Sequence, residues 1–501
     1  MKPRALLFVL LASLVPAGAA ETLDLTLQKA VQMALARNFR IKVEEFSPKI
    51  AKARQKSASG AFDPIVELSY TYDQRQTELR TLNTDLDAPT VVPGQPTPDL
   101  FARQDGHEID TSITGLLPWG MTYDIGPSLT IDNSNQRDPG YTRYDSFFGV
   151  SFVQPLLKNF GTDTNLADVR IARANLAISQ WQLRQQVIDV VTETIITYAE
   201  LYFALENLDV ERRSRDLAAQ LVADNTKRVE IGVMAPLDIT QARADLAARE
   251  ERVLVAERAV ADNENFLKQL VTDEIANLLD TRLRIVEPTL PDAKIDRKAD
   301  YARAFELRPD YRQALLDIQK RQITVVFTRN QALPRLDLVT SLGINGIDTN
   351  LAGSFTRVTG NANHNLAWNA GAIFSVPIPN RTGTGNLEVS KYEALRALVD
   401  LKRLEQAILV EIDNAAGQID TTRKRIEAAR VAREFAAETL EAGQARLASG
   451  TTTTFEVLQF QRDLANAEAA EFRARADHII ALARYARLTG TTLERNRIIL
   501  E

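Results

Sequence analysis

The stretch "GVMAPLDITQARADL" (residues 232–246) lies between two long segments with the pattern of helices, and "GTTTTFEVLQFQRDL" (450–464) has the same setting later in the chain. A glycine, a short turn and a new apolar-periodic run mark the end of one helix and the start of the next. Pro236 stands where the first residue of a helix is expected. The sequence therefore predicts two similar helix–turn–helix tips.

Long tracts without proline surround both tips, since none lies between Pro155 and Pro236 or after Pro379. A proline inside a helix costs about 3 kcal/mol, so such tracts allow very long helices. Apolar residues recur in alternating steps of four and three, which is typical of a coiled-coil seam. We expect a break or restart of the first helix at Ser47-Pro48. The expected helices span about 26–58, 165–231, 236–271, 298–330, 386–449 and 454–489.

Between the helices the apolar period changes to two, as in "IVELSYTY" (65–72) and "NLAWNAGAIFSVPI" (365–378). Alternation over about ten residues with an apolar and aromatic face is typical of membrane β-barrel strands. One such strand alone is also typical of a half-buried sheet in a soluble protein. The expected strands span about 65–76, 107–117, 120–131, 145–155, 335–346 and 365–378.

The order of elements is duplicated, and "FVQPLLKNFGTDTNL" (152–166) parallels "FSVPIPNRTGTGNL" (374–387). We therefore expect a first structural repeat over 21–285 and a second over 286–501. The first carries an extra hairpin at 107–131, preceded by a proline-rich loop at 86–99. Neither repeat has enough strands to close a barrel, and open sheet edges are not tolerated in lipid, so several copies must associate.

The first twenty residues combine Lys2 and Arg4, an apolar run and small residues, which predicts a signal peptide over 1–20. The chain of 501 residues has no cysteine, so it has no disulfides and no acceptor for an N-terminal lipid. Its formal net charge of −6 argues against a nucleic-acid binder. These features favour the periplasm or the outer membrane of a bacterium.

The duplicated order of helix, strand and long helix, "FSVPI" leading into "GTGNL", and the two tip turns together resemble the TolC family of outer-membrane channels. The resemblance implies an α+β membrane protein: a homotrimer with a shared transmembrane β-barrel that continues as a periplasmic coiled-coil α-helical tunnel. It implies passive export with a periplasmic adaptor (membrane fusion) protein and an inner-membrane transporter. Small-molecule efflux is favoured over type I protein secretion; the alternative is a periplasmic coiled-coil adaptor or scaffold. The extra hairpin leaves open an 18-stranded or a 12-stranded barrel.

The resemblance also places candidate residues at the tips. Family members carry two aspartates at the narrowest periplasmic point, where Glu456 and Gln459 match; Glu456 alone is also an ordinary acid at a helix start. Asp238 matches the aspartate of a family gate latch whose tyrosine and arginine are replaced here, and Arg446 lies close enough to substitute. The turns expected to dock the adaptor or pump contain Gly232, Val233, Pro236, Gly450, Thr451 and Thr452.

Nothing in the sequence predicts catalysis. The histidines His107, His364 and His478 lack the spacing of metal ligands. The glycines of "TGTGN" (382–386) lack the lysine of a phosphate-binding loop. We therefore expect no catalytic residue, no cofactor, no metal and no nucleic-acid partner, with outer-membrane lipid as the surroundings of the strands.

Overall fold

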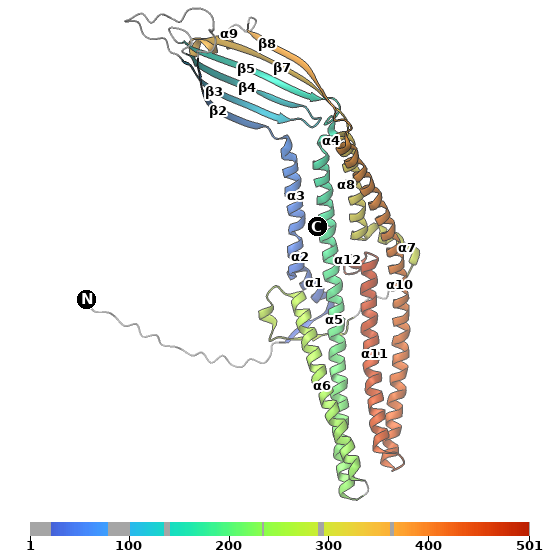
Figure 1. Cartoon of the computed structure of the whole chain (residues 1–501). Coiled ribbons are helices and arrows are strands. Elements are labelled where there is room, and N and C mark those ends of the chain that lie inside the picture. Colours follow the sequence, from blue (N-terminus) through green and yellow to red (C-terminus); the bar gives the residue numbers. More distant parts are fainter. Residues whose placement is uncertain are drawn as a thin grey trace, which may run out of the picture. The chain divides into compact units, whose positions relative to one another are not determined.

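The computed structural model describes residues 22–78, 101–134, 141–232, 235–288, 295–360 and 365–499 (Figure 1). The expected signal peptide, the proline-rich segment 86–99, Val233 and His364 lie outside these residues. The chain divides into two compact units, each built from segments of both expected repeats. The helical unit comprises Met1–Lys49, Ile178–Leu315 and Asp400–Glu501, and the sheet unit comprises Ile50–Ala177 and Leu316–Val399.

Two helices are far longer than the rest. The helix α5 (Ala167–Glu230) has 64 residues and α10 (Arg381–Ala448) has 68, so each is about 100 Å long at 1.5 Å per residue. Each is followed by a shorter helix after a tip turn, α6 (Pro236–Val271) after α5 and α11 (Thr454–Leu488) after α10. The described residues also form α4 (Thr162–Asn165), α7 (Arg297–Leu307), α8 (Pro309–Gln331), α9 (Leu351–Gly360) and α12 (Thr492–Arg495), with short 3-10 turns at Gly60–Phe62 and Ile275–Leu278.

Two expected helices are divided in the structure. The segment expected at 26–58 forms α1 (Leu27–Arg37), α2 (Phe39–Glu44) and α3 (Phe46–Ser59). The chain breaks at Asn38 because its side chain accepts a bond from the Arg40 amide and donates one to the Leu270 carbonyl. The segment expected at 298–330 breaks at Arg308, since Pro309 disfavours a helical conformation of the residue before it.

The main core of the helical unit packs around α5, whose buried residues include Val187, Val191 and Leu201 of the expected seam. A two-stranded parallel sheet, β1 (Thr22–Leu25) with β6 (Arg282–Ile285), covers it. The hydroxyl of Tyr198 lies 2.9 Å from the Leu25 carbonyl oxygen and 2.7 Å from that of Val286. Burial raises the pKa of Tyr198, so this hydroxyl stays protonated and holds the small sheet on α5.

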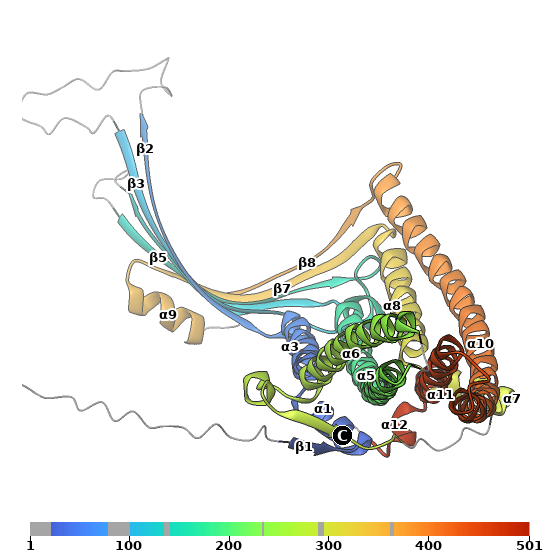
Figure 2. The ribbon, with the colours of Figure 1, turned by 90° about the horizontal axis from the view of Figure 1, so that it is seen from below.

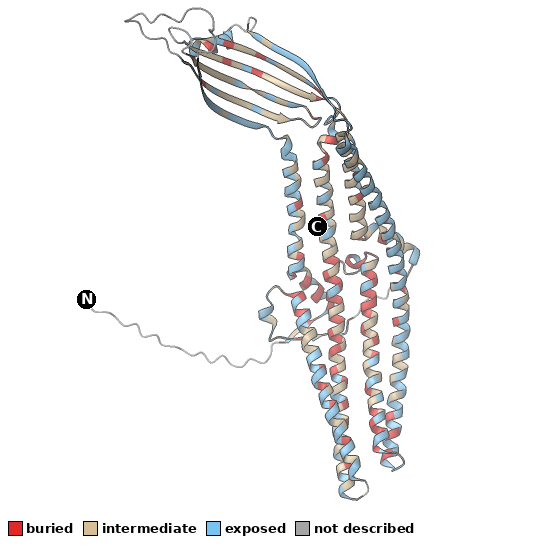
Figure 3. Ribbon diagram, viewed as in Figure 1, coloured by how far each residue is buried: buried red, intermediate tan, exposed pale blue. Residues whose placement is uncertain are grey.

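The sheet unit contains one six-stranded antiparallel sheet in the order β2-β3-β4-β5-β7-β8. Its strands are β2 (Ile65–Glu78), β3 (Phe101–Leu116), β4 (Thr122–Ser134), β5 (Tyr141–Pro155), β7 (Arg335–Asp348) and β8 (Leu366–Ser375). Viewed from below, the sheet is curved (Figure 2). The outer strands β2 and β8 are mostly exposed, while the inner strands are largely half-buried (Figure 3).

The two faces of this sheet differ in chemistry. The strand register places Tyr70, Ile109 and Leu129 on one face, and the same face is largely apolar on all six strands. The opposite face carries serine, threonine and most of the acidic residues of the strands, among them Glu67, Asp73, Glu108, Asp110, Asp124 and Asp132. The alternation read from the sequence therefore separates an apolar face from a polar, acidic one.

The helix α9 lies on the convex side of the sheet, over β5 and β7 (Figure 2). The hydroxyl of Ser354 in α9 hydrogen-bonds to that of Ser146 in β5 at 2.7 Å, and both side chains are buried. A Cβ atom on Gly346 would lie 2.0 Å from the Ser354 carbonyl oxygen. The glycine on β7 is thus what allows the helix to approach the sheet this closely.

The two junctions between strand and long helix share one device. Asn159 (φ 65°) and Asn380 (φ 51°) both adopt the left-handed conformation, which asparagine tolerates better than most residues. The side chain of Asn330, near the end of α8, accepts from the Asn159 amide at 2.7 Å and donates to the Leu157 carbonyl at 3.0 Å. The side-chain amide of Asn380 donates to the Ala332 carbonyl at 2.8 Å. Equivalent asparagines therefore turn the chain at both junctions.

Candidate functional site

The first tip joins α5 to α6. Gly232 has a φ of +80°, a conformation that glycine adopts without the steric cost of a Cβ atom, and its amide donates to the Val229 carbonyl at 3.0 Å. Pro236 is the first residue of α6, where its missing amide hydrogen costs nothing. Two large apolar side chains on either side of the turn, Ile231 and Leu237, are exposed to 73% and 65%.

The second tip joins α10 to α11 with the same backbone device. Gly450 has a φ of +78°, and the Thr451 amide reaches back to the Arg446 carbonyl at 2.9 Å. Thr453 caps α11, because its hydroxyl accepts a bond from the Glu456 amide at 3.3 Å. The second tip therefore starts its returning helix with a threonine cap, whereas the first tip starts its returning helix with a proline.

Glu456 lies in the first turn of α11, and its carboxylate accepts a hydrogen bond from the Thr452 hydroxyl. The amide of Gln459 donates to Asp463 at 3.0 Å and its oxygen accepts from Arg462 at 2.9 Å. Residues three and seven positions apart share one face of a helix, so Glu456, Gln459 and Asp463 form a stripe. Asp463 thus adds a second acid to the face where Glu456 keeps one of the two family charges and Gln459 has lost the other.

The two tips are bonded to each other within one chain. Arg228 in the last turn of α5 donates to the Leu447 carbonyl at 3.1 Å. The Asn225 amide donates to the Thr454 hydroxyl at 3.3 Å, and both of these residues are buried. A cluster of apolar residues surrounds these contacts, formed by Leu221, Leu440, Leu447, Val457 and Leu458.

Asp238 and Arg446 do not bond to each other within the part of the chain that the structure describes. Asp238 lies in the first turn of α6, where an acid is stabilised by the helix dipole. The backbone carbonyl of Arg446, rather than its guanidinium, takes part in the turn by accepting from Ser449 and Thr451. A latch between Asp238 and Arg446 thus stays a prediction that concerns neighbouring copies.

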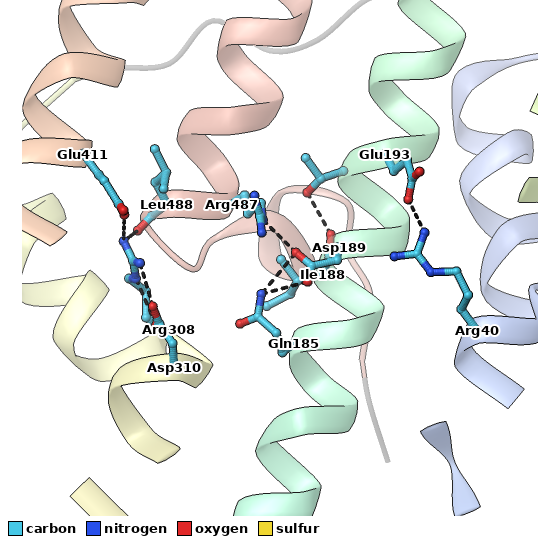
Figure 4. Close-up of polar contacts among 11 residues, drawn as sticks. Arg40, Gln185, Ile188, Asp189, Glu193, Arg308, Asp310, Glu411, Arg487 and Leu488 are labelled. Carbon is cyan, nitrogen blue, oxygen red and sulfur yellow. Dashed lines mark hydrogen bonds and ion pairs between the residues drawn. The ribbon is translucent and has the colours of Figure 1, made fainter. Parts of the chain in front are cut away.

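Farther from the tips, three arginines join the helices of the helical unit (Figure 4). Arg40 of α2 bonds to Glu193 of α5, and Arg487 of α11 bonds to Asp189 of α5 at 2.7 Å. Arg308 lies 2.7 Å from Asp310 and 2.9 Å from Glu411 of α10, and it also reaches the Leu488 carbonyl at 3.4 Å. Salt bridges at one level therefore tie α5, α10 and α11 to the shorter helices.

Arg308, Asp310 and Glu411 form a cluster, called the Arg308 cluster below, in which Arg308 and Asp310 have a defined protonation state. Burial alone would lower the pKa of the Arg308 guanidinium, but its bonds to Asp310 and Glu411 outweigh burial and raise that pKa. Burial would raise the pKa of the Asp310 carboxyl, but the bond from Arg308 outweighs it and holds the pKa of that carboxyl below its usual range. Both groups are therefore charged at neutral pH.

Across the described segments, no three side chains of histidine, aspartate or glutamate are grouped so that they could hold a metal ion. No helix among the described residues has a stretch that is both long and apolar enough to cross a lipid bilayer.

A protein-family model described as "Outer membrane efflux protein" matches residues 124–272 and 301–491. The chain is 26% identical over 333 residues to "Outer membrane protein TolC" of Escherichia coli (strain K12), a match that covers 64% of this chain and 64% of that protein. It is 22% identical to the protein of the same description from Vibrio cholerae, over 70% of this chain and 77% of that one.

Solved structures share the fold. The Campylobacter jejuni CmeC outer membrane channel superposes with a TM-score of 0.68 at 17% identity, over 93% of this chain and 86% of that one. The Vibrio cholerae outer membrane protein VceC superposes with a TM-score of 0.66 at 16% identity, over 93% of this chain and 96% of that one. The long helices and the antiparallel strands are thus the fold of known outer-membrane channels.

Proposed function

The chain belongs to the outer membrane efflux protein family and lies in the bacterial outer membrane with a periplasmic extension, and on that premise we propose that three copies form the exit duct of a tripartite export system. The duct passively conducts small molecules that an inner-membrane transporter and a periplasmic adaptor deliver to it. The strands of the three copies form one barrel, and the long helices form a periplasmic tunnel. The family is one of channels, not of enzymes.

The observation that carries this proposal is the six-stranded sheet with one apolar and one polar face and two open edges. The backbone groups along an open edge have no partner in lipid, where each costs several kcal/mol. When the open edges pair with those of other copies, these backbone groups gain hydrogen-bond partners and the sheets close into a barrel. The apolar face of the sheet then faces lipid, and the acidic face lines the water-filled lumen.

We place the narrow periplasmic aperture at the second tip. A carboxylate repeated by three-fold symmetry makes a charged ring, which selects for cations. Glu456 forms one such ring, and Asp463 forms a second ring two turns farther along the same helix face. Gln459 lies between them and holds Asp463 through its amide.

The tip turns are the docking surface for the adaptor or transporter. The support is the exposure of Ile231 and Leu237 beside Gly232 and Pro236 in the first tip, and of Phe455 beside Gly450, Thr451 and Thr452 in the second. Apolar side chains exposed at the ends of long helices favour contact with another protein. Val233, which lies outside the described residues, is part of the same proposed surface.

Planar lipid bilayers test the duct. Purified protein should conduct, and Glu456→Gln should lower the preference for potassium over chloride, measured as the reversal potential in a salt gradient. Asp280→Asn is the matched control, because it removes the same charge from a turn near the opposite end of α6. A protein that never conducts would contradict the duct, whereas unchanged selectivity of Glu456→Gln would remove that residue from the aperture.

An experiment in cells distinguishes small-molecule efflux from protein secretion. A strain that lacks this chain should accumulate a fluorescent efflux substrate, and the wild-type chain should reverse the accumulation. A strain with normal accumulation that fails to release a secreted protein would replace small-molecule efflux by secretion as the function.

A further inference from the structure

The extra hairpin of the first repeat is an integral part of the sheet. Its strands β3 and β4 lie between β2 and β5, paired with them in continuous antiparallel register. They have 16 and 13 residues, and a strand needs about 9–11 residues to cross the apolar core of a bilayer. Both are therefore long enough to be full membrane-crossing strands.

The apolar face continues without interruption across the hairpin. Each strand contributes one residue to a single row of directly opposite partners, and all six are apolar: Val66, Ile113, Ile125, Val150, Leu342 and Trp368. A hairpin placed outside a barrel wall would have no reason to match its neighbours in this way. The match indicates that this row faces lipid on all six strands, whereas α9 covers the same face of β5 and β7 near Ser146.

Both ends of this row are open. Val66 on β2 and Trp368 on β8 are each 71% exposed, because the two strands have a neighbour on one side only. With six alternating strands β2 and β8 run in opposite directions, so β8 of one copy can pair with β2 of the next as another antiparallel neighbour. An even number of strands per copy is what allows such a ring to close without a parallel pair.

We propose that three copies close a barrel of eighteen strands, six from each chain, and that β8 of each copy pairs with β2 of the next. This inference rests on the proposed trimeric duct. With strands about 4.8 Å apart and tilted by about 40°, eighteen strands give a backbone diameter of roughly 36 Å, against roughly 24 Å for twelve. The lumen at the level of the sheet then has about twice the cross-section of a twelve-stranded barrel.

The wider lumen assigns cargo selection to the helical tips. Side chains on the polar face of an eighteen-stranded barrel are too short to reach its centre. Known barrels of 16–18 strands are likewise filled with water. The barrel then passes any solute that the aperture admits, and the acidic face of the sheet lowers the local concentration of anions.

Disulfide trapping tests the position of the hairpin, and the chain offers a background without cysteine. Ser69 lies opposite Asp110, and Ser128 lies opposite Phe147, both pairs on the polar face. Cysteines at 69 and 110, or at 128 and 147, should crosslink within one chain, since opposite residues have Cα atoms about 4.5–5.5 Å apart. Cysteines at 69 and 147 should not crosslink, because two strands separate them; a crosslink there would overturn the proposal by placing β2 beside β5.

Electron micrographs of the trimer viewed along its axis test the barrel size. The intact chain should show the wider ring, and a variant without Phe101–Ser134 should show the narrower one, since residues 79–100 and 135–140 still join β2 to β5. A trimer that conducts but has the narrow ring with the intact chain would contradict the eighteen-stranded barrel alone. Absence of trimers and of conductance would contradict the duct itself.

Discussion

Arg228, in the last turn of α5, donates a hydrogen bond of 3.1 Å to the backbone carbonyl of Leu447, in the last turn of α10. The bond crosses from the first repeat to the second and joins the ends of the two longest helices. Leu447 is itself buried among the apolar residues of the tip cluster. This bond, the bond from Asn225 to Thr454 and the apolar cluster together join the two tips of one chain.

Arg228→Ala should weaken the contact between the tips, since it removes one of the bonds that join them. A charged hydrogen bond contributes about 1.5–3 kcal/mol, so its loss should raise single-channel conductance several-fold if tip separation opens the aperture. Arg215→Ala is the control, because Arg215 lies on the same helix but its hydrogen bonds go only to the adjacent Asp216. Equal conductance of both variants and the wild type would show that this contact does not hold the aperture closed.

Gly346→Ala should detach α9 from the sheet. The new Cβ atom would lie 2.0 Å from the Ser354 carbonyl oxygen and 2.9 Å from a methyl group of Val358, so the helix must shift. We expect a loss of about 1–3 kcal/mol in the free energy of unfolding. Trypsin cleavage after Arg357, which pairs with Asp348 at 2.9 Å in the intact protein, should become faster.

Gly371→Ala is the matched control for this substitution. Gly371 lies in β8 of the same sheet, and nothing lies within 4 Å of the position that its Cβ atom would occupy. Its stability and its cleavage should resemble the wild type. If both variants lost similar amounts of stability, the cost would come from the replacement of a strand glycine in general and not from the docking of α9.

The long elements of this fold could be predicted from the sequence because their signals are repeated many times along the chain. The heptad positions Val187, Val191 and Leu201 recur over many turns, and all three are buried as a seam requires. Strand alternation likewise extends over ten or more residues. Such signals tolerate a few exceptions, so each of these long elements can be recognised in the sequence, and the turn residues fix the start of the returning helices at Pro236 and Thr454.

Contacts between distant segments could not be predicted in this way. Nothing near Arg228 indicates that Leu447 is its acceptor, because a backbone carbonyl carries no signature in the sequence. The helix α9 is short and rich in glycine and threonine, so its apolar period is too brief to stand out. Asp463 could have been found, since its spacing of seven from Glu456 places both acids on one helix face.

The Arg308 cluster should make stability depend on pH in the acid range. The pKa of Asp310 is lower in the folded chain than in the unfolded one, so the pair contributes its full stability above the unfolded value of about 3.9. The contribution is lost as the pH falls through the lower, folded pKa. Thermal unfolding of the wild type between pH 7 and pH 2 should show this loss.

Asp310→Asn should remove that part of the pH dependence. At neutral pH we expect a cost of about 1 kcal/mol, since the Asp310 side chain is 39% exposed and water screens the pair. Asp280→Asn is the charge-matched control, because it removes one carboxylate that is not part of this cluster. An acid-range slope that is the same in Asp310→Asn and the wild type would show that other carboxyl groups control acid unfolding.

Arg249 of α6 is fully buried, and its substitution should loosen α6 from α5. Its guanidinium donates to Asp245 at 2.6 Å and to the carbonyl and hydroxyl oxygens of Ser214 at 2.8 and 3.0 Å. Burial lowers the pKa of Arg249, partly offset by the charge of Asp245. Removal of one partner from a buried pair costs about 3–5 kcal/mol, because the other charge is left uncompensated.

Arg249→Met should therefore lower the unfolding midpoint and speed proteolysis of α6, whereas Arg249→Met combined with Asp245→Leu should recover much of the loss. The recovery is expected because Asp245→Leu removes the carboxylate that Arg249→Met leaves without its partner. The free energy of unfolding of Asp245→Leu alone is also measured. If the losses of the two single variants add up to the loss of the double variant, the two residues act independently. Arg249 would then hold α6 through the bonds to Ser214, and Ser214→Ala should show part of the same loss.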